Sequence, residues 1–147
     1  MFMKPLKAGQ SWATYVISCL IENWSESRAS GAVPLPALIK LAHRLGISSI
    51  SAAAFGSAFD LAEAWLGRPL SVKRCCSDDL PAGERALIHM LKATGPVQGN
   101  GFAPAAKSGE LFDALVVAAT SARRLLAPQE HELDRLWHTV HVARLSH

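Results

Sequence analysis

Two groups of residues in this chain of 147 residues have side chains that could do chemistry. The first is the pair Cys75 and Cys76, which follows the basic residues Arg68 and Arg74. Neighbouring positive charge and the start of a following helix both stabilise a thiolate. A disulfide between adjacent cysteines would be strained, because their Cα atoms lie only about 3.8 Å apart. The pair is either a reactive or metal-binding thiol site, with His89 as a further ligand, or two small side chains that fill a turn. We favour the second interpretation, because metal sites usually space their cysteines by two or more residues.

The second group consists of His131, Asp134, His138 and His141 near the C-terminal end. Their spacing places all four on one arc of about 80° if this segment is helical. Three imidazoles and a carboxylate could bind zinc or another transition metal at the surface. The same pattern also describes the polar side of an amphipathic helix whose apolar residues occupy a different arc. We favour this second reading and predict no cofactor.

A helix-turn-helix is a further interpretation, for the stretch from Leu41 to Phe55. Ala42, Gly46 and Ala52 have the spacing that lets two helices meet through a tight turn. However, residues 47–60 contain no Arg, Lys, Asn or Gln to contact bases or phosphates. A DNA-binding regulator therefore remains the second alternative, and we do not expect nucleic acid as a partner.

Sequence motifs of the common enzyme classes are missing. The chain has no GxSxG, no P-loop, no GxGxxG after a strand and no HExxH. We therefore predict no catalytic residue and lean towards a protein that is not an enzyme.

The composition indicates a folded protein with more apolar surface than one small domain can bury. Half of the residues are hydrophobic and 18% are charged, below the usual value of about 25%. An apolar surplus of this kind favours an oligomer. The net charge of +3 is scattered, with no basic run longer than two residues. The longest uncharged run, residues 46–59, is too short to span a bilayer, and no signal peptide is visible. We expect a cytoplasmic protein.

Hydrophobic periodicity predicts helices throughout. The central one, residues 47–66, is apolar nearly all round and should be buried all round, with Asp60 and Glu63 as a polar edge in its later turns. Pro128 should separate the last two helices. We predict a single all-α domain, residues 1–147, of five or six helices, with residues 1–10 frayed and residues 95–104 a flexible loop. The expected helices cover residues 11–24, 36–45, 47–66, 80–94, 104–127 and the segment from 128 onwards.

Three short motifs follow one another after the predicted helical hairpin: RPL at residues 68–70, the cysteine pair, and ERALIHML at residues 84–91. In this order, between Leu38 and Ala127, the chain resembles small uncharacterised bacterial proteins of the domain-of-unknown-function type. The resemblance implies a single helical domain and brings no activity, cofactor or catalytic residue.

These observations together favour a non-enzymatic helical protein that acts through protein-protein contacts, as a homodimer or with another protein. Trp12 and Trp24 on the first helix and Trp137 on the last are the expected contact residues. The first alternative is a thiol- or metal-binding protein that uses Cys75 and Cys76.

Overall fold

The computed structural model of the chain describes residues 12–71, 81–92 and 109–145, with side chains as far as residue 128. These residues form five α-helices and no strand, which confirms the predicted all-α bundle. The predicted frayed start at residues 1–10 and the predicted loop at residues 95–104 lie outside the described residues. The helices are α1 (Trp12–Ala29), α2 (Pro34–Arg44), α3 (Ser49–Leu66), α4 (Ala82–Lys92) and α5 (Gly109–Leu145).

Helix α1 is longer than its sequence pattern indicates. The polar stretch after Trp24 reads as a linker, but the helix continues to Ala29. Ser25 and Ser27 are buried, and Arg28 forms ion pairs with α3. These tertiary contacts extend the helix by more than one turn beyond its apolar stripe.

Helices α2 and α3 form the tight hairpin that the sequence predicts. Gly46 has a φ of 80°, which glycine adopts without strain, and the N–H of Ile47 donates to the carbonyl of Ala42 at 2.8 Å. The side chain of Ser48 caps α3 by accepting from the N–H of Ser51 at 3.1 Å. Gly67, with a φ of 72°, ends α3 in the left-handed conformation.

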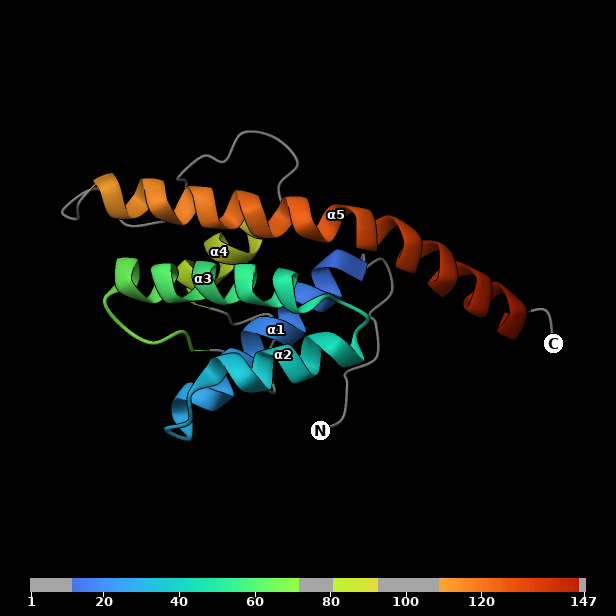
Figure 1. Cartoon of the computed structure of the whole chain (residues 1–147), viewed down its shortest axis with the longest axis horizontal. Coiled ribbons are helices and arrows are strands. Elements are labelled where there is room, and N and C mark those ends of the chain that lie inside the picture. The colour runs from blue at the N-terminus through green and yellow to red at the C-terminus, as the bar shows by residue number, and fades with distance from the viewer. Residues whose placement is uncertain (1–11, 72–80, 93–108, 146–147) are drawn as a thin grey trace.

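The core lies where α3 meets α1, α2 and α5, and helix α4 closes the bundle against α1 and α5 (Figure 1). Phe55 and Phe59 of α3 are fully buried beside Trp24 of α1. Helix α5 supplies the opposing wall and runs antiparallel to α3, so that Trp65 packs on Phe112 with ring centroids 5.3 Å apart. Burial of this kind stabilises the fold by about 1.5–3 kcal/mol for each large apolar side chain.

The prediction that the central helix is buried all round is wrong. One side of α3 is open to solvent, including Ile50, whose side chain is 70% exposed, and Ala53 and Ser57. The neighbouring helices α1, α2 and α5 cover only part of the circumference of α3, and the small residues of its open side tolerate water.

Pro128 does not separate two helices, contrary to the prediction. Helix α5 continues through this residue for 37 residues in all. A proline removes one backbone hydrogen bond and bends a helix without necessarily ending it. Figure 1 shows that α5 changes direction in its second half and projects past the other helices.

Within the described ranges, no helix is both long enough and apolar enough to cross a membrane.

Candidate functional site

The thiol and metal candidates are not brought together within the described residues. Cys75 and Cys76 lie outside those residues, so their role stays a prediction. His89 lies on the exposed side of α4. Among the side chains that the structure describes, no group of three His, Cys, Asp or Glu residues could hold a metal ion.

The backbone of the C-terminal histidine group is helical, as predicted. His131, Asp134, His138 and His141 all belong to α5. Their side chains lie beyond residue 128, where the description of side chains ends. A surface metal site on this helix therefore also stays a prediction.

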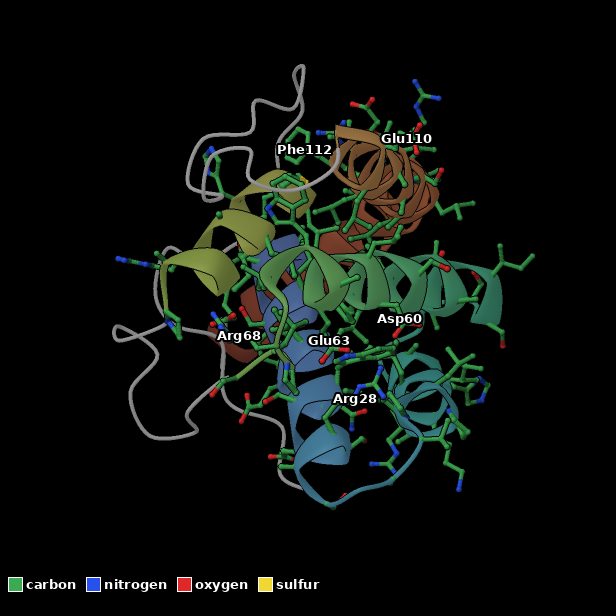
Figure 2. The ribbon with its side chains drawn as sticks, turned by 90° about the vertical axis from the view of Figure 1, so that its left-hand side faces the viewer. Arg28, Asp60, Glu63, Arg68, Glu110 and Phe112 are labelled. Carbon is green, nitrogen blue, oxygen red and sulfur yellow. The ribbon has the colours of Figure 1, made fainter. Side chains whose placement is uncertain are left out.

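A charged cluster lies where α3 ends, and Arg28 is at its centre. Its Nη2 lies 2.8 Å from Oδ1 of Asp60, and its Nε donates to Oε1 of Glu63 at 3.0 Å. The other carboxylate oxygen of Glu63 accepts the backbone N–H of Leu70 at 2.9 Å. Figure 2 shows the three labelled side chains meeting between α1 and α3. The cluster ties the end of α1 to α3 and to the segment that follows it.

The guanidinium of Arg28 also covers an aromatic ring. Its Cζ lies 5.2 Å from the ring centroid of Trp24, which in turn packs edge-on against Phe59 at 5.5 Å. A cation over an indole is attracted by the ring quadrupole. Both carboxylates of this cluster are already paired with Arg28, so the arrangement serves to hold helices together.

A second ion pair joins the exit of α3 to α4. Nη1 of Arg68 lies 2.8 Å from Oε1 of Glu84, and Nη2 donates to Oε2 at 3.3 Å. The carboxylate of Glu84 is completely buried, whereas 41% of the Arg68 side chain is exposed. Gly83 permits this approach, because a Cβ there would lie 2.7 Å from Cδ2 of Leu66. The pair fixes the beginning of α4 against the end of α3.

Cys19 is a half-buried thiol on α1, one turn from Tyr15. Burial, together with the charge of Cys19 and a hydrogen bond to it, raises the pKa of Tyr15 to about 12. The phenol is thus kept neutral, which suits a structural role at the edge of the core.

Helices α2 and α3 form the hairpin that the helix-turn-helix interpretation requires, but the exposed side of α3 lacks the side chains that contact DNA. On α3, the exposed residues from the start to the middle of the helix are Ser49, Ile50, Ala53 and Ser57. Their side chains offer two hydroxyl groups and no positive charge, whereas DNA recognition draws mainly on Arg, Lys, Asn and Gln.

Two of the three predicted contact tryptophans lie in the core. Trp12 is 7% exposed and Trp24 is 2% exposed. Side chains with this little free surface have little to offer a second protein. Trp137 lies in α5 beyond the described side chains.

An uncharged surface, here called the α3–α5 face, extends along the open sides of these two helices. Its three large apolar side chains are Ile50, Val117 and Leu125, which are 70%, 65% and 39% exposed. The hydroxyl of Ser51 lies 3.5 Å from the carbonyl oxygen of Leu125, so the first turn of α3 lies beside this part of α5. The remaining members of the face are the exposed small residues Ala53, Ser57 and Ser121.

Charged residues border this face. Asp60 is engaged by Arg28, Asp113 lies one turn before Val117 on the same side of α5, and Arg124 is exposed next to Leu125. Single apolar residues scattered on a protein surface are normal, whereas apolar residues gathered on one surface mark an interaction site. This face was not predicted from the sequence. The uncharged run at residues 46–59 is the sequence feature that could have indicated it.

Comparisons of the chain with protein-family models, with curated proteins and with solved structures found no match.

Proposed function

We propose that the chain is a non-enzymatic helical protein that acts through protein-protein contacts and associates with a second copy of itself through the α3–α5 face. The observation that carries the proposal is the exposure of Ile50, Val117 and Leu125 on the open sides of α3 and α5. Burying these side chains against a partner is favourable by about 25 cal/mol for each Å² of apolar surface removed from water.

The charge pattern supports the same proposal. The formal net charge is +3 and the chain carries 27 charged residues, yet the exposed residues of α3 from Ser49 to Ser57 include none. Interface cores are depleted in charged residues in the same way. A self-complementary contact needs one patch that meets its own copy, and an uncharged patch does so without repulsion.

Size-exclusion chromatography with light scattering tests the proposal on the full chain. We expect a dimer at tens of micromolar and a shift to monomer for Ile50→Asp. Val33→Asp is the matched control, because Val33 is 74% exposed and lies in the turn between α1 and α2, at the opposite end of the bundle from the start of α3 (Figure 1). A wild-type chain that is monomeric under these conditions would refute self-association.

A further inference from the structure

The outer side of α5 carries one row of side chains, here called the α5 row. The row consists of Glu110, Asp113, Val117, Ser121 and Arg124, which are all exposed and follow one another at intervals of three, four, four and three residues. At 100° per residue, this spacing places the five side chains within an arc of about 80°. Figure 1 shows α5 at one edge of the bundle, with the other helices on its inner side. The α5 row is therefore a side of the helix that no described helix covers.

The charges of the α5 row are separated by sign along the helix. Glu110 and Asp113 come before Val117, and Arg124 comes after it. At 1.5 Å per residue, Glu110 and Arg124 lie about 21 Å apart along the helix axis, too far to pair within one chain. Among the side chains that the structure describes, none forms an ion pair with the charged residues of this row. Their charges can therefore pair with a second molecule.

The spacing of the α5 row is the same in both directions from Val117. Glu110 lies seven residues before Val117, and Arg124 lies seven residues after it. In a dimer with two-fold symmetry, each contact between two different residues occurs twice. With the two-fold axis beside Val117, the two α5 helices run antiparallel, and Glu110 of each copy lies level with Arg124 of the other. Asp113 is one turn away, about 4.5 Å along the helix, within reach of the same guanidinium.

The apolar residue of the α5 row lies at the centre of this arrangement. On the axis, Val117 meets Val117 of the other copy, which covers a side chain that is 65% exposed in the single chain. A parallel arrangement would instead set Arg124 against Arg124 and Glu110 against Glu110, and like charges facing each other across an interface are unfavourable. Charged positions beside an apolar contact select the orientation of paired helices in the same way in coiled coils.

We propose that the two copies pair through antiparallel α5 helices, with Val117 on the two-fold axis and Arg124 of each copy bound to Glu110 and Asp113 of the other. This inference rests on the proposed self-association and adds the orientation of the two copies and the charged residues that fix it. Each dimer contains two equivalent groups of one guanidinium and two carboxylates, one on each side of the central valines.

Charge reversal tests this orientation, with light scattering on the full chain over a series of concentrations. Arg124→Glu sets a carboxylate against two others in both contacts of the dimer, so dimerisation should weaken by about tenfold. Glu110→Lys/Asp113→Lys should weaken dimerisation to a similar extent. Lys40→Glu is the matched control, because Lys40 is exposed on α2, which packs against α1 and α3. It changes the net charge by the same amount as Arg124→Glu and should dimerise as the wild type does.

Combining the reversals in one chain is the decisive measurement. In Glu110→Lys/Asp113→Lys/Arg124→Glu, each contact of the antiparallel dimer again joins opposite charges, so dimerisation should return to within about threefold of the wild type. The substituted ends of the row lie too far apart along the helix to compensate for each other within one chain. The effect of Arg124→Glu should also shrink at about 1 M NaCl, where the Debye length is about 3 Å. Circular dichroism should show the same helix content for all variants.

The outcomes separate the two proposals. A monomeric wild-type chain overturns both of them. A wild-type dimer that Ile50→Asp dissociates but Arg124→Glu leaves unchanged keeps the α3–α5 face and overturns the antiparallel pairing of α5. A combined variant that dimerises no better than Arg124→Glu also overturns this pairing.

Discussion

Replacing Arg68 with methionine should leave the carboxylate of Glu84 buried without its positive partner. The carboxylate has no exposed surface, and its two oxygens lie 2.8 and 3.3 Å from the guanidinium nitrogens. Removing one member of a buried ion pair typically costs about 3–5 kcal/mol. Because 41% of the Arg68 side chain is exposed, water reaches part of the vacated site. We therefore expect the lower end of that range, a loss of about 3 kcal/mol.

A double-mutant cycle isolates the pair from other effects of the substitution. Glu84→Met should cost less than Arg68→Met, because a half-exposed guanidinium can turn towards water. The double variant Arg68→Met/Glu84→Met should regain most of the loss, since apolar side chains of similar volume often replace a buried ion pair at little cost.

The assay is equilibrium unfolding in urea followed by the fluorescence of the four tryptophans, of which Trp12, Trp24 and Trp65 are buried in the folded chain. All four proteins are compared at one concentration, because self-association adds to apparent stability. The reasoning fails if Arg68→Met lies within about 0.5 kcal/mol of the wild type, the range of ordinary surface substitutions. It also fails if the double variant is no more stable than Arg68→Met.

Two further predictions concern the interior. Gly56→Val should destabilise the fold by about 1–3 kcal/mol through overpacking, because a Cβ added at this position would lie 3.1 Å from Cδ1 of Leu35 and 3.4 Å from the ring of Trp24. Ala64→Val, exposed on the same helix, is the control in urea unfolding, and equal stability of the two would contradict the packing argument. The chain has a single tyrosine, so tyrosinate absorbance reports Tyr15 alone and should give a midpoint near pH 12 in the folded chain, lowered in Cys19→Ala. Because the pKa is raised from 10.0, the stability linked to this group is complete below pH 10 and falls as the pH rises towards 12; a midpoint near 10 in the folded chain would show that the phenol is not buried as described.

The sequence predicts the helices and turns because their signals are local. Gly46 and Gly67 end α2 and α3 in the positive-φ conformations that glycine favours, and Ser48 caps α3. These features depend on a few neighbouring residues, so that periodicity and turn chemistry suffice to find them.

The remaining features depend on contacts between distant parts of the chain. Asp60 and Glu63 read as a polar edge, but their partner, Arg28, lies 32 and 35 residues away. The polar stretch around Ser25 reads as a linker because the burial that extends α1 comes from other helices. The sequence indicates a helix end at Pro128, because a proline removes one backbone hydrogen bond. The packing that holds the first half of α5 in place is not visible in the local sequence.

The candidate contact surface was not predicted, because the composition of α3 fits two different environments. A run of Ala, Ser and Gly with Ile50 fits a helix enclosed by neighbours and also fits a surface that awaits a partner. Hydrophobicity does not separate these cases, because both exclude charge. The enclosed helix and the exposed contact surface differ only in how many helices surround α3.

The antiparallel pairing of α3 with α5 has a consequence for how the chain folds. The contact between Ser51 and Leu125 joins residues 74 positions apart, and closing a loop of that length costs about 4 kcal/mol of chain entropy. During synthesis, α1, α2 and α3 are complete before Phe112, which packs on Trp65, has been made. Part of the apolar surface of the early helices therefore stays exposed until α5 has been synthesised. The assembly of this bundle depends on its last helix, and we expect folding to be slowest at that step.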